Sequence, residues 1–163
     1  MKLLFLFMLS SFLCLGQKLT FKEKKTAKKE IKNSTKDINT YPDRWKSYAI
    51  RAYFNLRLGN NHVVIQDCDI VIANCTRCTS ILDDLYDYKA KAYFNLKDYN
   101  KAIANFKKSI QYLKEDYEKA LTYVNIGNAY INLGNIKHGC FYFSRADELG
   151  EERGYDALTD YCE

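Results

Sequence analysis

A five-residue sequence, Ala-Tyr-Phe/Ile-Asn-Leu, occurs three times in this 163-residue chain and constrains its fold more than any other feature. The copies begin at Ala52, Ala92 and Ala129, so they are 40 and 37 residues apart. A polar turn follows each copy, and a second run of periodic apolar residues follows each turn. These second runs are Val64–Ile72, Ala102–Ile110 and Gly139–Ala146. Apolar residues three and four apart on both arms predict a repeated unit of helix, short turn and helix.

The composition agrees with a small helical domain. A single proline leaves long stretches free to be helical, and 47% hydrophobic residues exclude a chain that is disordered throughout. The length predicts one domain, too short for most two-domain cofactor enzymes. We interpret the many aromatic residues, fourteen Tyr and nine Phe, as wedges between helices.

The units resemble the tetratricopeptide repeat family, in which a unit of about 34 residues places small side chains where two helices touch. In the third copy the matching residues are Tyr123, Ile126, Gly127, Tyr130, Gly134, Gly139, Phe143 and Ala146. In the second they are Tyr86, Ala90, Tyr93, Leu96, Tyr99, Ala102, Phe106 and Ser109. In the first, aligned on Gly59, they are Tyr48, Ala52, Leu58, Val64, Cys68 and Val71. An alignment on Tyr53 needs two extra turn residues, and the Gly59 register puts Ala52 instead of Ile50 at the close contact.

The resemblance implies an all-α solenoid of about three helix-turn-helix repeats with capping helices. The predicted order is a signal peptide (1–16), a basic arm with a partial or capping repeat helix (17–44), repeat 1 (45–78), repeat 2 (83–116), repeat 3 (120–150) and a C-terminal capping helix (151–163). Glu30–Ile38 is predicted as the partial helix, and Pro42 stands where the family often has a proline between units. Terminal units need a polar outer face, and both ends supply one.

The first sixteen residues have the pattern of a secretion signal. Lys2 precedes the apolar run Leu3–Leu9, and Gly16 is a small residue at a plausible cleavage site. We expect cleavage after Gly16 and a secreted or periplasmic protein. An uncleaved membrane anchor and a lipid attached to Cys14 are alternatives. The lipid is less favoured because Leu13 stands where a lipoprotein signal needs a small residue.

Charge is unevenly distributed along the chain. Residues 17–46 hold ten basic and four acidic residues, a net charge of +6, whereas residues 147–163 hold one arginine and seven acids, a net charge of −6. A basic amino end can indicate nucleic acid or an anionic membrane as partner. Its cations are nearly all lysine and no aromatic residues alternate with them, so a solvated lysine-rich helix is favoured. We predict no nucleic-acid partner and no integral membrane span after cleavage.

The sequence contains no nucleotide-binding loop, nucleophile elbow or zinc-protease helix. Three close acidic pairs stand one or two residues apart, where helical side chains do not face each other, so they are interpreted as solvent-facing or helix-start charges. These pairs are Asp67 with Asp69, Asp83 with Asp84, and Glu151 with Glu152. His62 and His138 have no Cys or acid at ligand spacing. The sequence therefore predicts neither an enzyme nor a bound cofactor or metal.

Five cysteines remain after Cys14, and an exported chain meets an oxidising space. For Cys75 and Cys78 a disulfide that staples an extended connector at 72–82 is preferred to free thiols and to redox or metal chemistry. Cys140 and Cys162 are the second candidate pair, joining the last repeat to its capping helix. Cys68 takes a core position, so we expect it buried and unpaired.

The resemblance implies a non-catalytic module that binds a protein or peptide, as an adaptor or accessory subunit in the cell envelope or outside the cell. Its partner site would be the concave face lined by the first helix of each pair. The register places on it Tyr53, Arg57, Lys91, Phe94, Asn95, Asn125, Asn128 and Asn132. The asparagine amides are suited to a peptide backbone, with plain solvation as their alternative, and Lys91 and Arg57 to a carboxylate. The alternative function is a thiol-disulfide redox protein that uses Cys75 and Cys78; partner identity and oligomeric state stay open.

Overall fold

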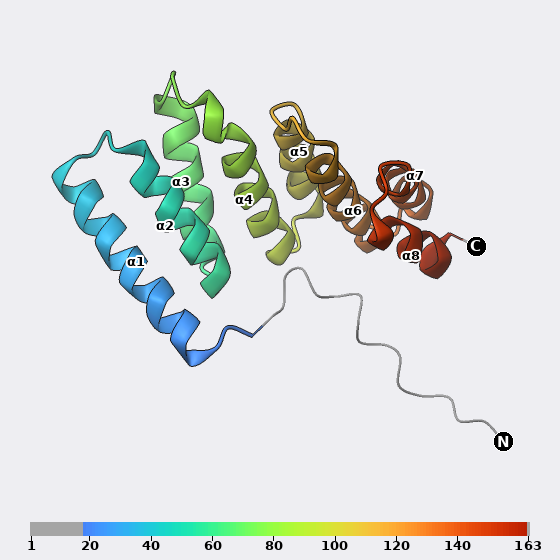
Figure 1. The fold of residues 1–163 in the computed structure, drawn as a ribbon, viewed down its shortest axis with the longest axis horizontal. Coiled ribbons are helices and arrows are strands. Elements are labelled where there is room, and N and C mark those ends of the chain that lie inside the picture. Colours follow the sequence, from blue (N-terminus) through green and yellow to red (C-terminus); the bar gives the residue numbers. More distant parts are fainter. Residues whose placement is uncertain (1–17, 163) are drawn as a thin grey trace.

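The computed structural model describes residues 18–162, and the predicted signal peptide lies outside them (Figure 1). The described elements are α1 (Phe21–Thr40), α2 (Trp45–Leu58), α3 (Asn61–Asn74), the short 3-10 helix η1 (Thr79–Ile81), α4 (Leu82–Asn95), α5 (Tyr99–Ile110), α6 (Asp116–Asn132), α7 (Ile136–Asp147) and α8 (Glu152–Tyr161). All regular structure in this part of the chain is helical, so the all-α prediction is confirmed.

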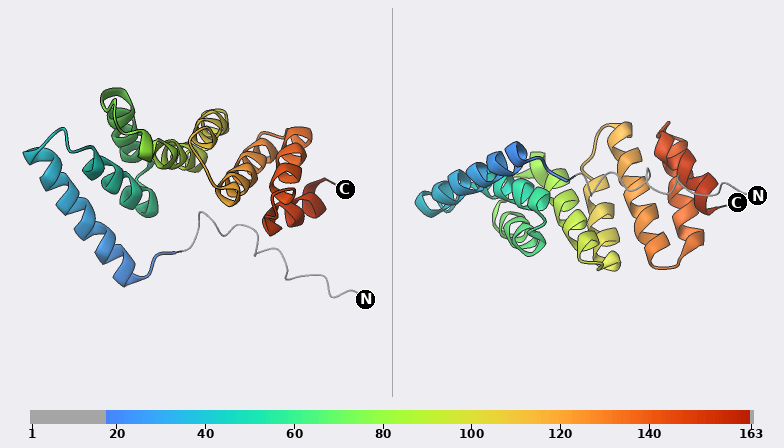
Figure 2. Two further views of the ribbon diagram at one scale, coloured as in Figure 1. Left: turned by 45° about the horizontal axis from the view of Figure 1, so that its top comes forward. Right: turned by 90° about the horizontal axis from the view of Figure 1, so that it is seen from below.

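The helices stack in chain order, each packed against the next (Figure 2). Helices α2 and α3, α4 and α5, and α6 and α7 form the three pairs. Helix α1 packs against the first pair and α8 against the last. Two pairs of neighbouring first-position helices also touch, since α2 contacts α4 and α6 contacts α8, whereas α4 and α6 both pack against α5, which lies between them in the chain. This arrangement is a solenoid, and it gathers α2, α4 and α6 on one side of the stack.

The first helix of each pair is followed by a residue with a left-handed backbone conformation. Gly59 and Gly134 have φ values of 80° and 75°, a conformation that glycine adopts without steric penalty. The second pair uses Lys97 instead, with a φ of 62°. This position is strained because a Cβ disfavours the left-handed region.

Small residues sit where helices approach most closely. Ala52 and Ala90 are fully buried, and the ring of Phe143 fills the space that a side chain on Gly127 would need. Ile50 is only half-buried, so the burial agrees with the Gly59 register of the first repeat. The largest fully buried side chains, Phe106 and Phe143, lie on the second helices of their pairs.

The helices differ in extent from the sequence expectations at three places. Helix α1 starts at Phe21, ahead of the predicted 30–38, because Thr20 and Glu23 cap each other's backbone amides. Helix α3 continues through Asn74, so the connector that follows is shorter than the predicted 72–82. Helix α6 begins at Asp116, where acids in its first turn favour the start of a helix.

The interpretation of Asp67 as a solvent-facing charge is wrong. Its side chain is 1% exposed, and both carboxylate oxygens accept hydrogen bonds from Arg51 on the neighbouring helix. The spacing of Asp67 and Asp69 along α3 does not reveal this partner, because Arg51 belongs to α2. Asp69 is exposed, as expected, and pairs with Lys89 of α4.

Candidate partner-binding surface

The eight residues predicted for the partner site all lie on the first helices of the pairs. Tyr53 and Arg57 belong to α2. Lys91, Phe94 and Asn95 belong to α4, and Asn125, Asn128 and Asn132 to α6. These helices follow one another on one side of the stack, and we call this side the α2/α4/α6 face.

Aromatic rings cover the α2 part of this face. Tyr53 is 38% exposed, and its ring lies 5.8 Å from that of Tyr88 on α4, measured between centroids. Tyr88 is half-buried, and burial with nearby carboxylates raises the pKa of its hydroxyl. Tyr88 was not among the predicted residues, although it stands three before Lys91 and so lies on the same side of α4.

The two predicted cations already meet carboxylates of the chain. The Lys91 ammonium lies 2.6 Å from Asp87 on the same helix, and the Arg57 guanidinium lies 3.1 Å from Glu23 of α1. Arg57 also lies over the ring of Tyr53, with 6.0 Å to its centroid. A peptide carboxylate would have to displace an internal ion pair at either position.

Two carboxylates of α4 that were not among the predicted site residues, Asp84 and Asp87, also lie on this part of the face. Asp84 and Asp87 stand three residues apart on α4, and Asp87 is followed four residues later by Lys91. Burial raises the pKa of Asp87 and that of Asp84. The carboxylates of Asp83, Asp87 and Glu118 raise the pKa of Asp84 further, and the ammonium of Lys91 opposes them. Glu118 belongs to α6, so a carboxylate of the next pair also contributes to the raised pKa of Asp84.

Within residues 18–162, two of the predicted asparagines on α6 have side-chain amides without a hydrogen-bond partner. Asn125 and Asn128 are half-buried, and no hydrogen bond engages either side chain among the described residues. Asn132 donates to the backbone oxygen of Asn128 over 2.8 Å. Asn95 of α4 is committed elsewhere, since its amide donates to the side chain of Asn61 over 3.0 Å. Phe94 packs edge-on against Tyr99, with 5.2 Å between centroids, and so contributes mainly to the core.

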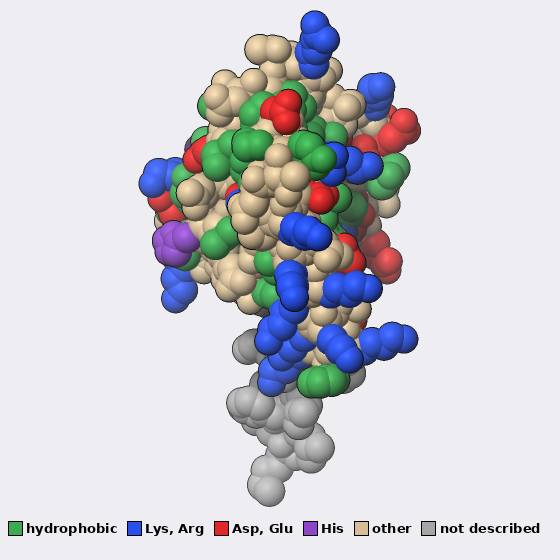
Figure 3. Space-filling model, turned by 90° about the vertical axis from the view of Figure 1, so that its left-hand side faces the viewer, with side chains coloured by type: hydrophobic (Ala, Val, Ile, Leu, Met, Phe, Trp, Pro, Cys, Tyr) green, Lys and Arg blue, Asp and Glu red, His purple; other side chains and the backbone are tan. Residues whose placement is uncertain are grey.

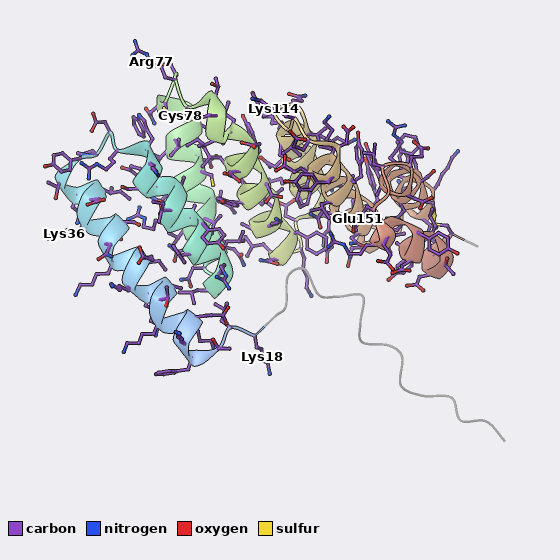
Figure 4. All side chains as sticks on the ribbon, in the orientation of Figure 1. Lys18, Lys36, Arg77, Cys78, Lys114 and Glu151 are labelled. Carbon is purple, nitrogen blue, oxygen red and sulfur yellow. A yellow bond between two sulfur atoms is a disulfide. The ribbon has the colours of Figure 1, made fainter. Side chains whose placement is uncertain are left out.

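The four candidate cysteines lie in two pairs at disulfide-bonding distance. Cys75 and Cys78 have Cα atoms 5.5 Å apart, and Cys140 and Cys162 have Cα atoms 5.7 Å apart. The first pair lies in the connector between α3 and α4, at the edge of the stack where Arg77 projects (Figure 4). Cys68 is fully buried and unpaired, and burial raises the pKa of its thiol.

Residues 18–162 contain neither a candidate metal site nor a candidate membrane-spanning helix. No group of three or more His, Cys, Asp and Glu side chains is arranged to hold a metal ion. No helix in the same range combines the length and apolar character that crossing a membrane requires.

Comparison with known proteins supports the repeat assignment. Residues 84–112 and 120–151 match the family model described as tetratricopeptide repeat, which covers α4 with α5 and α6 with α7. Over 120 residues the chain is 27% identical to human (Homo sapiens) tetratricopeptide repeat protein 6. This stretch is 72% of the chain but only 21% of the relative, so the chain spans about a fifth of that protein's length. The architecture is an all-α solenoid of the tetratricopeptide type, and such repeats suggest a protein-interaction module.

Proposed function

We propose that this tetratricopeptide-type solenoid is a non-catalytic module that binds an extended segment of a partner protein along the α2/α4/α6 face. The repeat match supports binding of a protein as the general role. The uncommitted amides of Asn125 and Asn128 carry the assignment of the face. A carboxamide both donates and accepts a hydrogen bond, as the backbone of an extended peptide requires.

The charges of the face favour a segment that contains lysine or arginine over a free carboxyl terminus. Lys91 and Arg57 are neutralised by Asp87 and Glu23, whereas no ion pair among the described residues engages Asp84, whose pKa the nearby carboxylates raise. A cation of the partner near Asp84 would relieve this repulsion. The exposed ring of Tyr53 offers an apolar contact beside it.

We place this activity in the cell envelope or outside the cell, as an adaptor or accessory subunit. The amino-terminal pattern at residues 1–16 supports export. Two cysteine pairs at bonding distance support an oxidising compartment.

The alternative function is thiol-disulfide exchange by Cys75 and Cys78, which lie in the connector between α3 and η1. Cys75 directly follows α3, and the carboxyl end of a helix carries partial negative charge. That charge disfavours the thiolate a redox-active cysteine needs, because such cysteines are activated at helix amino ends. The geometry therefore favours a structural bond.

Affinity capture from the native source tests the proposed face. We expect the wild-type protein to retain one or a few partners, and a variant with Asn125→Ala and Asn128→Ala to lose them. A matched variant with Asn33→Ala and Asn100→Ala, both exposed on other helices, should retain them. Equal capture by all three proteins would overturn the assignment of the face.

A further inference from the structure

The two ends of the stack are complementary halves of a repeat. Helix α1 precedes α2 in the position of a second helix, and no first helix stands before it among the described residues. Helix α8 follows α7 in the position of a first helix and has no second helix among the described residues. The α8 of one copy and the α1 of another would therefore complete one helix pair.

The outer side of α1 is a continuous stripe of lysines. Three- and four-residue steps align them on one side of the helix, opposite the buried Ala27, Ser34 and Ile38. The stripe consists of Lys22, Lys25, Lys29, Lys32 and Lys36, all exposed. Figure 3 shows the basic side chains gathered on this side of the molecule.

Internal ion pairs do not neutralise this stripe. The acids Glu23 and Asp37 of α1 pair with Arg57 and Arg44, which belong to neighbouring segments. Among the described residues, no ion pair involves a lysine of the stripe. Phe21, 85% exposed, stands at the start of the same helix.

The outer side of α8 carries the opposite charge. Glu152, Asp156 and Asp160 stand four residues apart and are exposed, and no ion pair among the described residues engages them. Gly154 and Ala157 are buried on the opposite side of the helix. An aromatic residue is exposed here as well, since Tyr155 is 61% accessible.

We propose that α8 of a second copy of this chain docks on the lysine stripe of α1, so that copies associate head to tail. Charge complementarity selects this occupant, and the half-repeats at the two ends provide matching geometry. An anionic membrane would satisfy the lysines but would leave the acidic side of α8 without a role. A head-to-tail contact uses different surfaces on each copy, so it builds a ring or an open filament. The α2/α4/α6 face takes no part, so this inference is independent of the proposed function.

Sedimentation velocity of the purified protein over a concentration series tests the contact. We expect self-association at low salt that weakens at least about tenfold near 1 M salt, where the screening length falls to about 3 Å. A variant with Lys25→Glu, Lys29→Glu and Lys32→Glu should be monomeric alone. A variant with Glu152→Lys, Asp156→Lys and Asp160→Lys should also be monomeric alone. An equimolar mixture of the two should associate again, because each offers the charge that the other now lacks.

The outcomes that overturn the proposal are equally specific. A wild-type protein that stays monomeric at low salt contradicts it, as does a mixture of the two variants that fails to associate. Binding to anionic phosphatidylserine vesicles by a protein that does not self-associate would assign the stripe to a lipid surface instead. All six substituted residues are exposed, so circular dichroism should show unchanged helix content in both variants.

Discussion

Arg51 on α2 holds the buried carboxylate of Asp67 on α3 at two points, with Nε 2.9 Å from Oδ2 and Nη2 2.7 Å from Oδ1. The third nitrogen of the guanidinium, Nη1, donates to the hydroxyl of Thr35 on α1 over 3.3 Å. One side chain therefore joins three successive helices at the amino end of the stack. The fork geometry of arginine suits this role, since a lysine offers no paired donors.

Asp67→Ala should lower the free energy of unfolding by about 3 kcal/mol, because it leaves the part-buried charge of Arg51 without its partner. Asp69→Ala is the matched control. Asp69 pairs with Lys89 at an exposed position, where such pairs contribute about 1 kcal/mol or less. Urea denaturation of the two variants measures the difference, and equal losses would contradict the structural role of Asp67.

Lys97→Gly should stabilise the protein by about 1 kcal/mol, because glycine adopts a φ of 62° without the steric penalty of a Cβ. Lys97→Ala retains the Cβ and should change stability little. The reciprocal substitution Gly134→Ala, at a φ of 75°, should destabilise by a similar amount. Thermal unfolding followed by circular dichroism compares the three variants; a stabilising Lys97→Ala would show that the charge of the lysine, and not its Cβ, causes the strain.

Cys162→Ser should lower the free energy of unfolding by about 3 kcal/mol, because the bond to Cys140 restricts the unfolded chain over a separation of 22 residues. Cys78→Ser opens a separation of only 3 residues and should cost about 2 kcal/mol or less. Denaturation without reductant gives both values. A larger loss for Cys78→Ser would contradict the loop-entropy account.

Insulin reduction in the presence of dithiothreitol should proceed no faster with this protein than without it, because Cys75 lies at the end of α3 where a thiolate is disfavoured. The Cys75→Ser variant should behave identically to the wild type. A rate enhancement that the variant loses would establish the redox function and contradict a purely structural bond.

The repeat made the fold predictable, because small residues such as Ala90 and Gly127 recur at the positions where helices touch. The start of α1 could also be predicted from the sequence, since Thr20 and Glu23 have the spacing of a capping box. The burial of Asp67 was not, because its partner Arg51 stands sixteen residues earlier on another helix. Ion pairs between helices depend on packing distances that spacing along one helix does not report.

The candidate site was predictable to the level of the helices that form it. The repeat register placed Lys91 on α4. Its ion pair with Asp87 follows the four-residue helical spacing, so the sequence could have predicted that the charge of Lys91 is neutralised. The pairing of Arg57 with Glu23 was not, because the two residues are 34 positions apart. The proposed preference for a basic segment over a carboxylate rests on both pairs.

Photo-cross-linking shows directly whether a partner binds on the α2/α4/α6 face. A photoreactive amino acid replaces Asn132, exposed on α6, in one protein and Asn100, exposed on α5, in the other. After irradiation in the native source, we expect a defined cross-linked partner from position 132 and none from position 100. A partner cross-linked only from position 100, or no product from position 132, would contradict binding on this face.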